Sequence, residues 1–151
     1  MQLDMRARAE IIEEQMARRV AARKTLILDF YGFMSATELA DLNQSKAKNR
    51  HTLANNWKRR DKAFSVLYLD ENDEILEVFP KFQFRNNKPI KTVQRILKVF
   101  AAAQKSPWNI ALWFTSNNGW LHDGLTPVDL LEASPEAVVY AAQREANKSA
   151  V

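Results

Sequence analysis

Cysteine is absent from this chain of 151 residues, and histidine and glycine are scarce, with two and three copies. Without cysteine the chain has no disulfide framework, no thiol nucleophile and no thiolate metal site. The glycines form no phosphate-cradling loop. Asp123 directly follows His122, and adjacent residues on a loop rarely share an orientation, so this pair is not a convincing acid and base. We therefore predict that the protein is not an enzyme and uses no cofactor and no metal.

Long apolar runs are missing as well. The first residues mix acidic and basic side chains, and no stretch approaches the roughly 20 apolar residues of a membrane span. With 46% hydrophobic and 26% charged residues, the chain can bury a core as one domain or two small ones. These features predict a cytoplasmic protein that has no membrane partner.

Positive charge is concentrated at the front of the chain. Residues 1–62 hold 13 Lys+Arg and 8 Asp+Glu, whereas residues 106–151 hold 2 and 5. The formal net charge is +4 and the pI is about 9.4. A positive field at the front permits an acidic partner there but does not require one, and the tail is acidic.

The segment from Ser35 to Lys62 predicts two short helices around a turn. Ser35 is followed three residues later by a glutamate, which is the pattern of a capping box at a helix start. The first helix would end near Leu42, where polar residues interrupt the pattern. Ser45 can cap a second helix that ends near Arg60. This arrangement is typical of a helix-turn-helix.

The second of these helices is expected to present a basic and polar face. Lysine and arginine neutralise phosphates, while asparagine pairs with adenine and arginine with guanine in the major groove. The alternative is a solvated face that only keeps the protein soluble. The residues that we predict to contact DNA are Lys46, Lys48, Asn49, Arg50, Thr52, Asn55, Asn56 and Arg59.

Before and after this segment the pattern predicts one helix and one β-hairpin. Residues 4–24 carry apolar side chains at steps of three or four between charged ones, which is typical of a helix with a solvated or dimer-packing face. An apolar run from Thr25 to Met34 leads into the capping box. Residues 63–69 and 75–84 are rich in β-branched and aromatic side chains around an acidic turn, which predicts a hairpin. Phosphates would repel that turn, so we expect the hairpin to pack rather than bind DNA.

The rest of the chain is expected to be helical. A helix from Pro89 places its apolar residues on one stripe, which indicates core, and residues 108–114 are apolar nearly all round, as in a buried helix. Two further places combine a capping side chain with a proline at the first helical position. They predict short helices over residues 127–133 and 135–147.

Together these elements predict a fold that is mainly α with one small β-hairpin. Residues 1–105 would form a DNA-binding region of the helix-turn-helix kind, winged if the hairpin lies beside it. Residues 106–151 would form a small helical domain that binds a partner.

The stretch GWLHDGLTPVDLLEASPEAVVYAAQREA, residues 119–146, resembles the toxin-binding domain of the Xre/MbcA/ParS antitoxin family. That domain has a leucine-turn-proline helix and a second helix that begins near a Pro-Glu. The upstream sequences FPKFQF (residues 79–84) and W-x-x-A-x-W-F (residues 108–114) also look like those of short helix-turn-helix proteins with this tail. The matching positions in the tail are Trp120, Leu121, Gly124, Thr126, Pro127, Leu130, Leu131, Pro135, Glu136 and Val139.

In that family the N-terminal part commonly binds operator DNA, and the tail binds a toxin, often of the NAD-consuming RES class. The resemblance implies an antitoxin of a type II toxin-antitoxin pair that represses its own operator as a homodimer. A protein-interaction module that does not bind DNA is the alternative. The residues that we expect to contact the toxin are Trp120, Leu121, Leu125, Pro127, Leu130 and Leu131.

Overall fold

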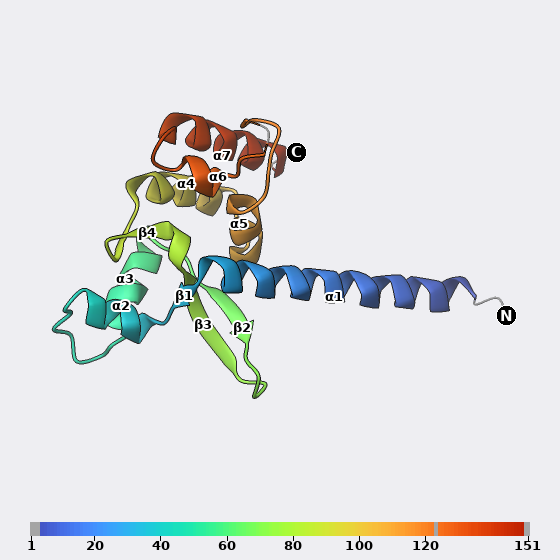
Figure 1. Ribbon diagram of the computed structural model, residues 1–151, viewed down its shortest axis with the longest axis horizontal. Helices are drawn as coiled ribbons and strands as arrows, with labels where there is room; N and C mark the ends of the chain where they lie inside the picture. The colour runs from blue at the N-terminus through green and yellow to red at the C-terminus, as the bar shows by residue number, and fades with distance from the viewer. Residues whose placement is uncertain (1–3, 123, 150–151) are drawn as a thin grey trace.

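The computed structural model describes residues 4–122 and 124–149, and these form a mainly helical fold with small antiparallel sheets. One long helix projects from the body of the molecule, as Figure 1 shows. No helix in the described ranges has both the length and the apolar character needed to cross a bilayer. The elements are α1 (Met5–Tyr31), β1 (Phe33–Met34), α2 (Ala36–Leu42), α3 (Thr52–Arg59), β2 (Val66–Leu69), β3 (Ile75–Pro80), the 3-10 helix η1 (Lys81–Gln83), β4 (Phe84–Arg85), β5 (Lys88–Pro89), α4 (Lys91–Ala102), α5 (Pro107–Phe114), α6 (Pro127–Leu130) and α7 (Pro135–Ser149).

The projecting helix, α1, is longer than the sequence predicts. The predicted end at Lys24 is wrong, because the apolar run that follows stays helical as far as Tyr31. Gly32 ends the helix with a φ of 78°, a left-handed conformation that glycine adopts without strain. The helix meets the body near its C-terminal end, where Ile27 and Leu28 are buried.

Helix α2 begins where the sequence predicts it. Ser35 Oγ accepts a hydrogen bond from the Glu38 amide at 3.1 Å, and Glu38 Oε1 accepts one from the Ser35 amide at 3.3 Å. These two bonds confirm the capping box, because each side chain satisfies an amide that the helix start leaves free.

Helix α3 begins later than predicted. The predicted start after Ser45 is wrong, because residues 45–51 form an irregular loop and the helix starts at Thr52. Within the loop, Asn49 Oδ1 accepts a hydrogen bond from the His51 amide at 2.9 Å, and Ser45 Oγ accepts one from the amide two residues on. Such local bonds from asparagine and serine compete with the helical pattern.

The predicted hairpin is present and gains a third strand. β2 and β3 pair antiparallel, with Val66 opposite Val78, and Asp70 Oδ1 holds the acidic turn by accepting two amide hydrogen bonds at 2.8 Å. β1 pairs with the other edge of β3 and places Phe33 opposite Pro80. This strand is too short for an alternating pattern, so the sequence does not reveal it.

A second, smaller hairpin precedes α4. Asn86 and Asn87 join β4 to β5 with φ angles of 51° and 64°, the left-handed pair that a two-residue hairpin turn requires. Pro89 therefore belongs to β5, and α4 begins at Lys91, slightly later than predicted.

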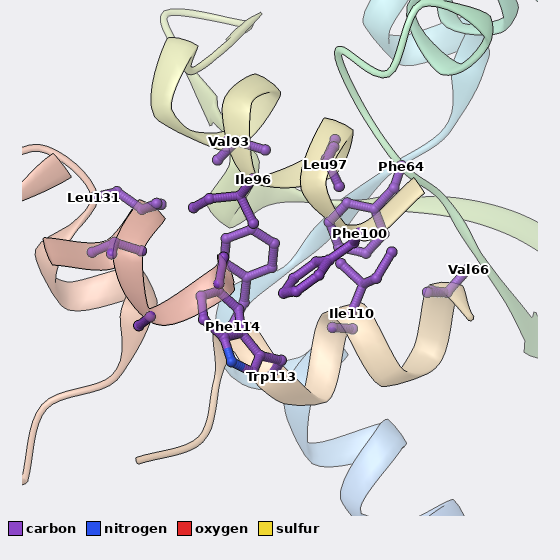
Figure 2. Packing of buried hydrophobic residues seen from close by; sticks show 14 of the residues in the cluster. Phe64, Val66, Val93, Ile96, Leu97, Phe100, Ile110, Trp113, Phe114 and Leu131 are labelled. Atoms are coloured by element: carbon purple, nitrogen blue, oxygen red, sulfur yellow. The ribbon is translucent and has the colours of Figure 1, made fainter. Parts of the chain in front are cut away.

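The main core lies between α4, α5, α7 and the base of the hairpin (Figure 2). Phe114 is fully buried and stacks on Phe64 at 6.0 Å between ring centroids, and Trp113 meets Phe100 edge-on at 5.0 Å. One face of α5 therefore lies in the core, as the sequence predicts, whereas Pro107 and Asn109 are exposed. The core combines side chains from before and after residue 105, and the predicted division into two domains stays a prediction.

A smaller core holds α2 and α3 together. Its members include Leu39, Ala54 and Phe79, each 0% exposed. Gln83 links this region to the main core, because its amide Nε2 donates to the Phe64 carbonyl at 2.8 Å and its Oε1 accepts from the Phe64 amide at 2.9 Å.

Candidate nucleic-acid interface and partner surface

The outer face of α3 carries half of the residues predicted to contact DNA. Thr52, Asn55, Asn56 and Arg59 recur at steps of three and one, so they fall on one stripe of the helix. Asn55 and Arg59 are exposed, while Ala54 faces the smaller core. Arg59 Nη2 donates to Asn56 Oδ1 at 2.6 Å, which orients both side chains on the surface.

The other predicted residues lie in the loop before α3 and not on the helix. Lys46, Lys48 and Asn49 are exposed there. None of the ion pairs found in the described residues involves either lysine, so both ammonium groups face solvent. The loop therefore brings two cations to the N-terminal end of α3.

Arg50 makes internal contacts instead. Its guanidinium pairs with the Asp41 carboxylate, and Nη1 donates to the carbonyls of Ser45 at 3.0 Å and Ala47 at 3.2 Å. A planar guanidinium with several donors suits this role, because it can bridge a carboxylate and two carbonyls at once. Arg50 thus fastens the loop to α2 and positions the two exposed lysines.

Further basic residues near α3 escaped the sequence reasoning. Arg60 is exposed at the end of the helix, and Lys62 and Lys88 line a hollow of about 440 Å³ beside Trp57. Lys88 belongs to β5, which is far from α3 in the sequence but lies beside it in the fold, so no local sequence pattern identifies this lysine. The connection of residues 43–51 is longer than the roughly three- or four-residue turn of a helix-turn-helix, and that motif stays a prediction.

An exposed aromatic platform lies on the C-terminal part of the chain. Trp120 is 53% exposed and meets Tyr140 of α7 edge-on at 6.0 Å. The Arg144 guanidinium lies 4.6 Å from the centre of the Trp120 ring. This cation–π contact holds the indole in place while leaving much of it open to solvent. The sequence predicts that Trp120 contacts the partner protein. Tyr140 and Arg144 are not predicted, because only the packing of α7 brings them next to Trp120.

The other predicted contact residues divide into surface and core. Leu121 and Leu130 line a hollow of about 360 Å³ next to Trp120, and Leu125 is half-buried. Pro127 and Leu131 are buried and do not line this hollow. Asp123, considered above as an acid or base beside His122, lies outside the described residues.

Tyr31 ties the end of α1 to this part of the chain. Burial raises the pKa of its phenol, and the nearby Asp129 carboxylate raises it further, whereas a hydrogen bond with Thr126 opposes the shift. No group of three or more His, Asp or Glu residues in the described ranges is arranged to hold a metal ion. No family model, no curated protein and no solved structure matches this chain.

Proposed function

We propose that the protein is a DNA-binding transcriptional regulator that acts as the antitoxin of a type II toxin-antitoxin pair in the cytoplasm. The observation that carries the proposal is the stripe of α3 with its exposed residues Asn55 and Arg59, together with the exposed Lys46 and Lys48 in the loop before the helix. The family resemblance of the tail supports the second half of the proposal.

In this proposal α3 lies in the major groove. Asn55 and Arg59 reach base edges, where an amide reads adenine and a guanidinium reads guanine. Lys46 and Lys48 contact phosphates and fix the position of the helix on the duplex. Arg50 keeps the loop in place through its bonds to Asp41 and the loop carbonyls.

The C-terminal surface is the proposed binding site for the toxin, of the RES type if the resemblance extends that far. Exposed tryptophan, tyrosine and arginine are the residues that contribute most energy to protein interfaces. Trp120, Tyr140 and Arg144 present this combination beside the hollow lined by Leu121 and Leu130.

A homodimer formed through α1 completes the proposal. A single helix without tertiary contacts is marginal in water, because most helical stability in proteins comes from packing of an apolar face. The N-terminal part of α1 projects away from the body in Figure 1. Its exposed apolar residues recur at steps of three or four, and we propose that a second copy covers them. The stripe residues and their exposed fractions are Met5 85%, Ile12 55%, Met16 58% and Val20 46%.

A protein-interaction module without DNA binding is the second candidate. The observation that favours it is the long connection before α3, in which Arg50 bonds internally. This candidate predicts partner binding through the Trp120 surface and no retention on DNA at physiological salt.

The experiment that tests the proposal measures binding of Asn55→Ala and Arg59→Ala variants to a duplex from the protein's own promoter. Each substitution removes one base contact and should weaken binding to the promoter by about 1–3 kcal/mol, and binding to a scrambled duplex by less. Lys98→Ala is the matched control, because Lys98 is an exposed cation on α4. Changes no larger than that of the control would contradict the assignment of α3.

A further inference from the structure

A basic hollow of about 410 Å³ lies at the start of α4. Arg85 and Lys88 from the small hairpin and Lys91 from the helix line it, together with Thr92 and Glu132. Of the residues that the sequence predicts to contact DNA or toxin, only the buried Leu131 reaches its wall. The position and charge of the hollow raise the question of which ligand it fits.

The helix start in this hollow is uncapped. Ile90 occupies the capping position and has no side-chain oxygen to offer. Within the described residues, the amides of Lys91, Thr92 and Val93 have no hydrogen-bond acceptor. Lys91 and Thr92 line the hollow, and their two free amides together with the positive end of the helix dipole favour an anion at this point.

The largely buried side chain of Thr92 supplies a second, independent sign of a ligand. Thr92 is 8% exposed, and its hydroxyl has no hydrogen-bond partner in the described parts of the chain. Thr25 and Thr115 behave differently, because their hydroxyls donate to the carbonyl four residues earlier, at 3.1 Å and 2.9 Å. Thr92 lines the hollow, so its free hydroxyl is available to a bound oxygen atom.

The charge balance of the hollow favours an anion over a cation. Three cations line it, and the one carboxylate among its described lining residues, that of Glu132, is already paired with Arg85. Lys88 and Lys91 are exposed, and no ion pair in the described residues involves them. A tetrahedral anion with several acceptor oxygens can therefore use the amides, the hydroxyl and both ammonium groups together.

We propose that the start of α4 is a phosphate-binding site formed by the amides of Lys91 and Thr92, the Thr92 hydroxyl, and the ammonium groups of Lys88 and Lys91. The phosphate we assign to it is one of the DNA backbone, which rests on the proposed function. Helix N-termini commonly contact DNA phosphates. Lys88 also lines the hollow beside Trp57 of α3, so one cation serves both places.

The test is a titration of the ¹⁵N-labelled full chain with inorganic phosphate at constant ionic strength, with chloride as the comparison ion. The amide signals of Lys91 and Thr92 should shift and saturate with phosphate alone. Thr92→Val should weaken phosphate binding several-fold without lowering the melting temperature, because the hydroxyl has no partner to lose. Lys98→Gln, which removes a charge from the same helix, should leave the affinity unchanged. Glu132→Gln should raise the affinity, because it removes the carboxylate that lines the hollow.

Shifts that do not saturate, that chloride reproduces, or that Thr92→Val leaves unchanged would overturn the site as an adventitious ion interaction. A lower melting temperature of Thr92→Val would also count against it, by showing that the hydroxyl is structural.

A second titration with duplex DNA identifies the source of the phosphate. The same two amides should shift, and Lys91→Gln should weaken binding to promoter and scrambled duplexes equally, since a backbone contact carries no sequence information. Saturation by phosphate with no DNA binding would support the site with a free phosphate compound as its ligand, and would refute the proposed function. DNA binding through α3 that leaves these amides unshifted would overturn the backbone assignment alone.

Discussion

The contacts of the Arg50 guanidinium could not be predicted from the sequence. Its type and position predict a DNA contact, yet its guanidinium bonds to Asp41 and to two loop carbonyls. The residue type alone does not show whether an arginine contacts a DNA phosphate or holds a loop of its own chain. Only the fold of the loop, which depends on the local bonds of Ser45 and Asn49, decides between the two.

The contacts of Arg50 predict a stability change at this residue. Arg50→Ala should lower the free energy of unfolding by about 1–3 kcal/mol, because it removes a charged donor from several acceptors. Lys48→Ala should change it by no more than about 0.5 kcal/mol, since Lys48 is an exposed loop cation. Urea denaturation measures both. Equal stability of the two variants would show that Arg50 does not fasten the loop.

The raised pKa of Tyr31 predicts that the stability of the folded protein depends on pH. Its pKa is raised in the folded protein, mainly by burial, so the unfolded chain ionises first as the pH rises above about 10. The stability that the protonated phenol contributes is therefore fully present below about pH 10 and is lost as the pH rises through the pKa of the folded state. The test compares the melting temperatures of the native chain and Tyr31→Phe between pH 8 and pH 11. At the alkaline end, the melting temperature of the native chain should fall relative to that of Tyr31→Phe. A difference in melting temperature that stays constant across this pH range would contradict the raised pKa of Tyr31.

Elements with strong local signals were predictable, and elements without them were not. Ser35 caps α2 through the predicted capping box, and Thr126 caps α6 directly before a proline as predicted, because both signals involve residues close in the sequence. The strands β1, β4 and β5 are too short to show periodicity. The sequence misplaces the start of α3, because the Ser45 side chain, which the pattern predicts to cap the helix, bonds within the loop.

The two serines allow a direct comparison. Ser35→Ala should lower the free energy of unfolding by about 1 kcal/mol, the usual cost of losing a helix cap. Ser45→Ala should cost less, because its hydroxyl accepts a long bond of 3.4 Å from Ala47 and caps no helix. Chemical denaturation of both variants tests this difference. A larger loss of stability for Ser45→Ala would restore the predicted helix start.

At the scale of the whole molecule, composition and pattern predict a mainly helical fold, and the structure agrees. They do not predict how the parts share cores. α4 and α7 pack together from distant places in the sequence, and the Arg95 guanidinium joins them by donating to Glu136 at 2.6 Å and 3.1 Å. That bond lowers the pKa of Glu136. The projection of α1 is also a property of the assembled molecule, because the helix pattern alone does not show which part is covered.

The exposed stripe of α1 predicts the oligomeric state. Met16→Glu places a charge in the stripe and should convert a dimer to a monomer, halving the mass measured by light scattering. Ala17→Glu adds the same charge about 100° around the helix and should leave the dimer intact. A native chain that is monomeric at every concentration, or a Met16→Glu variant that remains dimeric, would contradict dimerisation through this stripe.

The measurement that tests the central claim most directly is binding of the purified protein to its own promoter fragment and to a scrambled fragment, over a range of salt concentrations. Sequence recognition by α3 predicts tighter binding to the promoter at every salt concentration, with affinity for both fragments falling as salt displaces the lysine contacts. Equal affinity for the two fragments, or no binding at physiological salt, would contradict the claim that α3 reads DNA.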